Sequence, residues 1–187
     1  MNLVVLPDIF GRTDCFDKLV WQLSSGYEDV VVIDPYDGVY HEFADEQEAY
    51  TYFMNNIGVE GYAEFLSERL NVLNPNDLHL LGFSVGASAI WSVSEKSGLN
   101  IASCTCFYSS QIRKMLDIKP NFSVDLIFAN REPAYDVDEV IDYLSATDSV
   151  NCIKSDYLHG FMNEKSLNFN PTGYAEYLSF LKERKPL

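Results

Sequence analysis

Short, almost uninterrupted apolar runs alternate with longer segments of helical periodicity along the chain. The runs have the length and the Val, Ile and Leu content of strands that are buried on both faces, as in a parallel sheet. They occupy Leu3–Leu6, Val30–Ile33, Leu78–Leu81, Ile101–Phe107, Val124–Ala129 and Val150–Lys154. Strand–helix alternation with right-handed crossovers gives a sheet with helices on both faces. The sequence therefore predicts an α/β fold, a three-layer α/β/α sandwich around a mostly parallel sheet of about six strands.

Between these runs, apolar side chains recur with a period of about 3.6 residues, which is typical of amphipathic helices. The clearest stripes cover Phe16–Leu23, Tyr62–Leu73, Val137–Leu144 and Tyr174–Leu181. The length of 187 residues suits one domain, and no internal repeat, linker or compositional break divides the chain. We therefore expect a single domain over residues 1–187.

The charge balance narrows the range of partners. Asp and Glu number 28 and Lys and Arg 13, so the formal net charge is −15. A nucleic-acid backbone or an anionic membrane would have to associate against a repulsive field. We see neither an apolar stretch of the roughly 18 residues that a transmembrane helix needs nor the basic start of a secretory signal. We expect a cytoplasmic protein that binds neither nucleic acid nor membranes.

The four cysteines, Cys15, Cys104, Cys106 and Cys152, lack the spacing of a zinc site or of a redox-active pair. We interpret them as small buried apolar side chains in a reducing compartment. No metal site and no cofactor are expected.

The most informative stretch, from Leu78 to Ala89, joins a predicted strand to the start of a small-residue helix through G-x-S-x-G. In that context the motif forms a nucleophile elbow. Ser84 would occupy a strained turn, and side chains at Gly82 and Gly86 would collide with the flanking strand and helix. The alternative is an ordinary Gly/Ser-rich turn, including the phosphate loop of a flavodoxin-like module, but neither a P-loop lysine nor G-x-G-x-x-G is present.

A serine hydroxyl becomes a good nucleophile when a base accepts its proton. In folds built around this elbow the catalytic residues follow the order Ser, acid, His. His41 and His79 precede Ser84, so His159, just beyond the last predicted strand, is the only candidate base.

The acid is expected after the strand Val124–Ala129, where Glu132 stands nearest to the strand end. Asp136 is its chief rival, although an acid there would also make a good N-cap for the following helix. Acyl transfer further requires donors for the oxyanion. We expect these to be the backbone N–H of Val85, which follows the nucleophile, and that of Ile9, in the loop after the first strand.

At this point the sequence resembles the dienelactone hydrolases of the α/β-hydrolase superfamily. The resemblance rests on Val4–Gly11, Gly82–Gly86, Phe128–Glu132 and His159–Phe161. It implies that Asp8 stands where the family has a glutamate that contacts the nucleophile, and that Ile9 is an oxyanion donor. Ser84 replaces the family's usual cysteine and Glu132 its usual aspartate, which suits a serine esterase triad. Without the resemblance, Asp8 can equally be a turn residue or a helix cap.

These observations favour a cofactor-independent serine hydrolase that forms an acyl-enzyme through a Ser-His-Glu triad. The arginines that hold the dienelactone carboxylate in the similar family have no match here, and a charge of −15 disfavours an anionic substrate. We therefore expect an uncharged small ester or thioester as substrate. The alternative is a non-catalytic α/β-hydrolase relative that binds a small molecule or a protein partner. The oligomeric state is not indicated by the sequence.

Overall fold

The computed structural model describes residues 1–73 and 77–183. Its strands form one sheet in the order β2-β1-β3-β4-β5-β6, and every neighbouring pair is parallel. The strands are β1 (Asn2–Leu6), β2 (Val30–Val32), β3 (Leu78–Phe83), β4 (Ile101–Phe107), β5 (Ser123–Phe128) and β6 (Val150–Lys154). All the predicted strands are confirmed, and the described sheet is wholly rather than mostly parallel.

The helices are α1 (Asp14–Ser24), α2 (Glu46–Asn56), α3 (Gly58–Leu73), α4 (Val85–Val93), the short 3₁₀ helix η1 (Ser110–Lys114), α5 (Val137–Leu144) and α6 (Pro171–Glu183). Of these, α2 was not predicted, because within it only Ala49 and Phe53 are buried and no apolar stripe results. Its start does carry a local signal, since the side chain of Asp45 accepts a hydrogen bond from the backbone N–H of Glu48 (2.8 Å).

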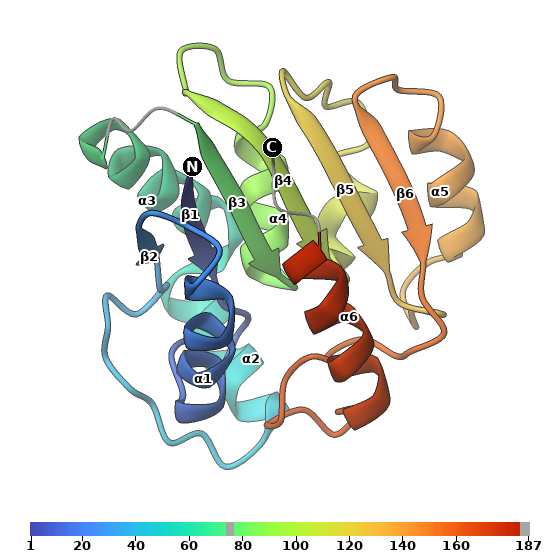
Figure 1. The fold of residues 1–187 in the computed structure, drawn as a ribbon. Helices are drawn as coiled ribbons and strands as arrows, with labels where there is room; N and C mark the ends of the chain where they lie inside the picture. Colours follow the sequence, from blue (N-terminus) through green and yellow to red (C-terminus); the bar gives the residue numbers. More distant parts are fainter. Residues whose placement is uncertain (74–76, 184–187) are drawn as a thin grey trace.

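The sheet is covered on both faces, as a three-layer sandwich requires (Figure 1). Side chains of successive strand residues point to opposite faces. In β1, Leu3 and Val5 therefore belong to the apolar cluster that includes residues of α1 and α6, whereas Val4 and Leu6 belong to the cluster on the other face, which includes residues of α3, α4 and α5. Both faces of the central strands β1 and β3 are buried, which explains why these strands are almost uninterrupted apolar runs.

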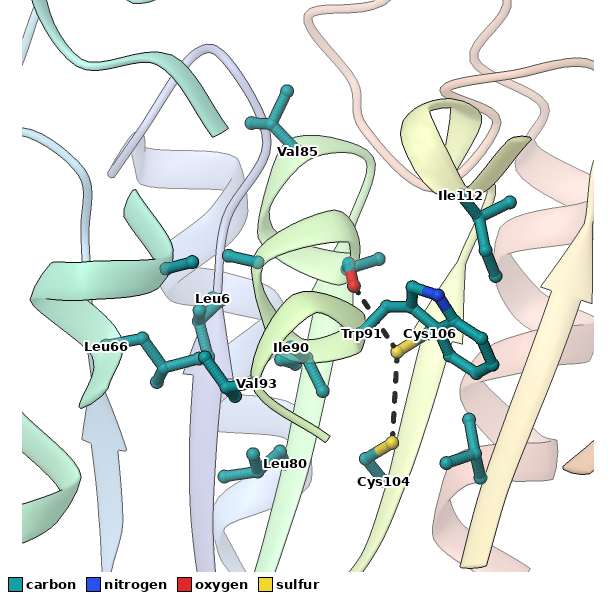
Figure 2. Packing of buried hydrophobic residues seen from close by; sticks show 14 of the residues in the cluster. Leu6, Leu66, Leu80, Val85, Ile90, Trp91, Val93, Cys104, Cys106 and Ile112 are labelled. Atoms are coloured by element: carbon teal, nitrogen blue, oxygen red, sulfur yellow. Dashed lines mark hydrogen bonds between the residues drawn. The ribbon is translucent and has the colours of Figure 1, made fainter. Parts of the chain in front are cut away.

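Helix α4 is buried throughout most of its length and is fixed by Trp91 (Figure 2). The Trp91 indole is fully buried, and its Nε1–H donates to the carbonyl oxygen of Met115 at 2.9 Å. Ile112 of η1 belongs to the same apolar cluster. These contacts hold the segment after β4 against the helix that follows Ser84.

The strand order reverses at β1, which has β2 on one side and β3 on the other. The carboxyl ends of the strands lie together at the lower end of the view in Figure 1. In open α/β sheets, ligands bind outside the carboxyl ends at such a switch point. The loops that follow β1 and β3 contain Ile9 and Ser84, so the topology places the predicted oxyanion and nucleophile residues at this point.

Candidate active site

Ser84 occupies a sharp turn between β3 and α4. Its backbone has φ 51° and ψ −109°, a left-handed conformation that non-glycine residues rarely adopt. The turn is held by a hydrogen bond from the Ser84 N–H to the Phe107 carbonyl at 2.9 Å. This geometry is the one expected of a nucleophile elbow, in which strain is retained at a functional residue.

The two glycines of the motif are required by close packing. A Cβ atom at Gly82 would lie 2.7 Å from the backbone nitrogen of Ala87. A Cβ atom at Gly86 would lie 2.5 Å from the carbonyl oxygen of Pro7. The second contact shows that the start of α4 abuts the end of β1, so the clash at Gly86 arises from a neighbouring strand rather than from β3.

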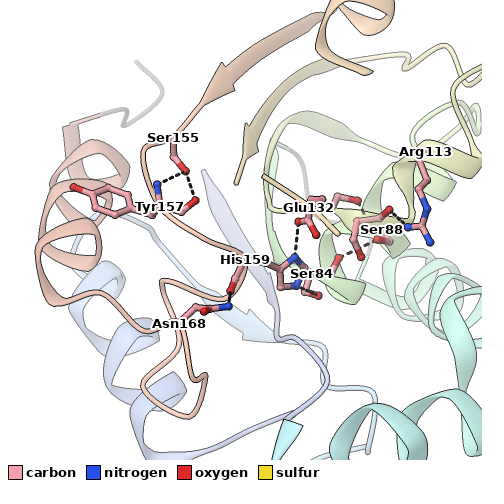
Figure 3. Close-up of polar contacts among 10 residues, drawn as sticks. Ser84, Ser88, Arg113, Glu132, Ser155, Tyr157, His159 and Asn168 are labelled. Carbon is pink, nitrogen blue, oxygen red and sulfur yellow. Dashed lines mark hydrogen bonds and ion pairs between the residues drawn. The ribbon is translucent and has the colours of Figure 1, made fainter. Parts of the chain in front are cut away.

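Three side chains from distant parts of the chain meet beside this turn (Figure 3). The Ser84 hydroxyl oxygen lies 2.9 Å from Nε2 of His159, and Nδ1 of His159 lies 2.7 Å from Oε1 of Glu132. His159 lies in the loop between β6 and α6, and Glu132 follows β5. The three residues thus come from the ends of three strands, in the order expected from the sequence.

The hydrogen bonds define the tautomer of His159. A carboxylate accepts hydrogen bonds, so the proton at Nδ1 is donated to Glu132. In the neutral ring Nε2 then has a free lone pair, which accepts the hydrogen bond from the Ser84 hydroxyl. Only 5% of the Glu132 side chain is exposed, so this carboxylate is shielded from water. The arrangement can draw a proton from Ser84 onto the imidazole.

The rival acid and the other histidines have different partners. The Asp136 carboxylate caps α5 by accepting hydrogen bonds from the N–H groups of Asp138 (2.9 Å) and Glu139 (3.4 Å). His79 hydrogen-bonds to Ser103 (2.8 Å) within the sheet. His41 packs among aromatic rings, including that of Phe43 at 5.0 Å between centroids. Of the expected site residues, the structure brings Glu132 and not Asp136 to His159.

The backbone N–H groups of Ile9 and Val85 are both unoccupied: neither donates to any residue in the described ranges. Val85 is the first residue of α4, where N–H groups have no partner within the helix and carry the positive end of its dipole. Ile9 lies two residues after Pro7, whose carbonyl oxygen approaches the start of α4 at Gly86. Both N–H groups are therefore free to bind a developing oxyanion.

Asp8 is also buried close to the site, but the structure does not join it to Ser84. Its carboxylate accepts hydrogen bonds from the Phe10 N–H (3.0 Å) and from the side-chain amide of Asn163 (2.7 Å). Burial raises the pKa of Asp8, and these hydrogen bonds and the nearby His159 partly oppose that rise. The nucleophile contact implied by the resemblance is therefore not among the hydrogen bonds of the described residues.

Ser88, Ser109 and Tyr108 also support the site, although none of the three was predicted as a catalytic residue. The Ser88 hydroxyl donates to the Ser84 carbonyl (3.0 Å) and pairs with the Ser109 hydroxyl (3.0 Å), which braces the turn. Tyr108 has a positive φ of 38°, and its ring centroid lies 4.9 Å from that of His159. A helical i, i+4 spacing from Ser84 to Ser88 was the available signal for Ser88. The Ser88–Ser109 and Tyr108–His159 contacts join segments that follow different strands, so no local sequence pattern predicts them.

An open cleft of about 630 Å³ adjoins the triad on the side of His159. Its lining residues are Ser110, Arg131, Glu132, Pro133, Leu158, His159 and Asn168. A second hollow, of about 700 Å³, is lined by Phe10 and by residues of the segments that follow it. Ser84 lines neither hollow, and only 7% of its surface is exposed.

We found no residues suited to hold a metal ion: residues 1–73 and 77–183 contain no group of three or more His, Cys, Asp or Glu side chains placed for that purpose. Within the same ranges, no helix combines the length and the apolar character needed to cross a bilayer.

Solved structures share this fold at low sequence identity. A lipase-esterase related protein from Clostridium acetobutylicum ATCC 824 matches with a TM-score of 0.62 and 12% identity, covering 96% of this chain and 93% of that one. A candidate hydrolase of the alpha/beta superfamily from Xanthomonas campestris pv. campestris matches with a TM-score of 0.65 and 12% identity, covering 97% of this chain and 96% of that one. The enol-lactonase from Burkholderia xenovorans LB400 matches with a TM-score of 0.64 and 8% identity, covering 98% of this chain and 91% of that one.

No family model matches the chain. One curated relative, the uncharacterized protein YczH of Bacillus subtilis (strain 168), is 31% identical over an alignment of 160 residues, and the match covers 79% of this chain and 77% of the relative. The closer resemblance to dienelactone hydrolases stays a prediction. The protein belongs to the same family as Bacillus subtilis YczH, and its fold is that of the α/β-hydrolase superfamily.

Proposed function

We propose that this protein is a serine hydrolase of small, uncharged carboxylic esters or thioesters. The observation that carries the proposal is the continuous hydrogen-bonded chain from Ser84 through His159 to Glu132 at a strained strand–helix turn. The names of the structural matches, which include a lipase-esterase related protein and an enol-lactonase, agree with chemistry at an ester bond.

In the proposed reaction, the Ser84 hydroxyl attacks the substrate carbonyl while Nε2 of His159 accepts its proton. Glu132 holds the Nδ1 proton and stabilises the imidazolium that forms. The imidazolium then protonates the leaving alcohol or thiol as the carbonyl–heteroatom bond breaks, which leaves an acyl ester on Ser84. Water attacks this ester with His159 again as base, the acid is released, and the Ser84 hydroxyl regains its proton.

Each tetrahedral intermediate carries a negative oxygen. The free N–H groups of Ile9 and Val85 are the proposed donors to it. Val85 adds the favourable potential of a helix N-terminus. A donor of this kind typically contributes about 10²–10³ in rate, because it binds the oxyanion more strongly than the ground-state carbonyl.

The substrate is proposed to enter from the cleft beside His159. The leaving group must lie within reach of Nε2, and this cleft adjoins the imidazole. The preference for an uncharged substrate is supported by the net charge of −15, which repels anions at long range.

A fluorophosphonate probe tests the proposal directly, because it phosphonylates a serine only when the hydroxyl is activated. The wild-type protein is expected to be labelled at Ser84 and to hydrolyse p-nitrophenyl acetate. Ser84→Ala should abolish the labelling and reduce hydrolysis by roughly 10⁴-fold or more. The control is Ser24→Ala, at a half-buried serine at the end of α1, which should behave as wild type.

Turnover that survives in folded Ser84→Ala would refute the proposed mechanism. If folded wild-type protein is neither labelled nor active, the result would favour the non-catalytic alternative, in which the elbow and His159 only shape a binding site.

A further inference from the structure

Asp8 is a buried carboxylate without a compensating cation. Its exposed fraction is 7%, and it forms no ion pair with any residue of the described ranges. Burial of a carboxylate is costly unless hydrogen bonds replace water. Asp8 therefore needs the two amide donors that it contacts, and their positions in the chain indicate what the carboxylate does.

One oxygen of Asp8 organises the loop that follows β1. Oδ1 accepts the Phe10 N–H at 3.0 Å, and the Asp8 carbonyl accepts the Gly11 N–H at 3.0 Å. These two bonds close a tight turn around Ile9 and use the amides on its C-terminal side. The Ile9 N–H itself is left free, in a turn whose conformation depends on the Asp8 side chain.

The other oxygen reaches the loop that carries His159. Oδ2 accepts a hydrogen bond from Nδ2 of Asn163 at 2.7 Å, across 155 positions in the sequence. The orientation of the Asn163 amide is determined independently, because its Oδ1 accepts the Lys165 N–H at 2.8 Å. Nδ2 must then face Asp8.

Asn163 and His159 belong to one compact set of turns. The Phe161 N–H donates to the Leu158 carbonyl (3.2 Å), and the Asn163 N–H donates to the Gly160 carbonyl (2.9 Å). The backbone between the two residues therefore has little freedom, and a displacement of Asn163 also displaces the imidazole. The Asp8–Asn163 bond is a direct link between the oxyanion loop and the base loop.

We infer that Asp8 is a positioning residue. Its hydrogen bond to Asn163 holds the Ile9 amide and the His159 imidazole in fixed positions relative to Ser84. The inference rests on the proposed function. It differs from the contact with the nucleophile that the family resemblance implies, because here the Ser84 hydroxyl bonds to His159 while Asp8 bonds to Asn163. Misplacement of reacting groups by about 1 Å can cost 10²-fold in rate, so a link of this kind has a measurable effect.

A reciprocal exchange tests the inference. In Asp8→Asn, two side-chain amides face each other as donors, whereas in Asn163→Asp two carboxylates face each other. Each single variant keeps its backbone partner, Phe10 or Lys165, because a side-chain oxygen remains available to accept that N–H. In the double variant Asp8→Asn/Asn163→Asp, the amide and carboxylate exchange places, so the bond is restored with reversed polarity and unchanged total charge.

Kinetics with p-nitrophenyl acetate, well below the melting temperature of every variant, provide the readout. Each single variant is expected to lower kcat by about 10- to 100-fold with little change in KM, because the lost alignment matters most in the transition state. The double variant should recover kcat to within about 3-fold of wild type. The control is Asp125→Asn, which alters a similar carboxylate–amide hydrogen bond, from Nδ2 of Asn151 to Oδ1 of Asp125 (2.7 Å), between β5 and β6. It should leave kcat nearly unchanged.

Three results would overturn the inference. Single variants with wild-type kcat would show that the link has no effect on alignment. A double variant no better than the single variants would show that negative charge at position 8 matters rather than the bond. An unlabelled, inactive wild-type protein would remove the proposed function and this inference with it. By contrast, a labelled wild type together with an unrescued double variant removes this inference alone.

Discussion

Glu132 binds His159 through a hydrogen bond of 2.7 Å, and its side chain is 5% exposed while that of His159 is 30% exposed. The carboxylate is therefore much more buried than the imidazole, although both residues line the cleft. Such an arrangement holds one tautomer of His159 and shields the carboxylate from competing water. Glu132 precedes a proline and follows an arginine in a loop, so nothing in its immediate sequence distinguishes it from a surface acid.

Replacement of Glu132 by glutamine should remove most of the activity. The amide can present its N–H group to Nδ1, which favours the tautomer that has its proton on Nε2 and cannot accept the Ser84 proton. The expected loss in kcat is about 10⁴-fold, by analogy with the acid of other serine triads. Ester hydrolysis and the rate of fluorophosphonate labelling measure it.

Asp136→Asn is the matched control for Glu132→Gln. Asparagine is itself a good N-cap, so the cap of α5 should persist with a small change in stability, within about 1 kcal/mol. The kcat should stay near the wild-type value. A large loss of activity in this variant, with Glu132→Gln still active, would transfer the role of the acid to Asp136.

Gly86→Ala should disrupt the junction between the elbow and β1. The new Cβ would lie 2.5 Å from the Pro7 carbonyl oxygen and 2.7 Å from that of Leu6, both backbone atoms that cannot move alone. Such overpacking typically destabilises a protein by about 1–3 kcal/mol. Because the shift falls between Ser84 and Ile9, labelling should slow as well. Urea unfolding and probe labelling measure the two effects.

The control for this variant is Gly61→Ala in α3, where the nearest atom to the new Cβ is the Ile57 side chain at 3.9 Å. This substitution should raise stability by about 0.5–1 kcal/mol, since alanine favours helices more than glycine does. Labelling should remain at the wild-type rate. Equal losses of stability in both variants would contradict the steric explanation.

The raised pKa of the buried Asp34 should make the free energy of unfolding depend on pH. Desolvation raises the pKa of Asp34, although hydrogen bonds from the N–H groups of Gly38 and Arg12 partly oppose the rise. The folded protein therefore retains this proton at pH values at which the unfolded chain has lost it. Stability from this group is present in full below the unfolded pKa and is lost as the pH rises through the higher folded value.

The measurement is urea unfolding of wild type and Asp34→Asn between pH values of about 4 and 7. Asparagine does not titrate, so the difference in unfolding free energy isolates Asp34. The wild type should lose stability relative to the variant as the pH rises. If the stability of the wild type instead rose relative to that of Asp34→Asn as the pH increased, the hydrogen bonds would outweigh desolvation and the folded pKa of Asp34 would be lowered.

Much of the scaffold follows from short-range patterns. The strand β1, for example, is almost entirely apolar because both faces of the sheet are covered there, and that requirement appears in the sequence residue by residue. The spacing of Gly82, Ser84 and Gly86 likewise predicts the elbow, because only glycine fits beside the turn. By contrast, α2 was missed, since it buries only Ala49 and Phe53 and shows no stripe.

The sequence by itself determined the order of the strands and helices, the elbow, and the choice of His159, the single histidine that follows Ser84. Only the tertiary structure decided between Glu132 and Asp136 as the partner of His159, and only it paired Asp8 with Asn163. The physical reason is one of range. Periodicity and turn chemistry act between near neighbours, whereas these pairings depend on which loops the parallel sheet brings to the same edge.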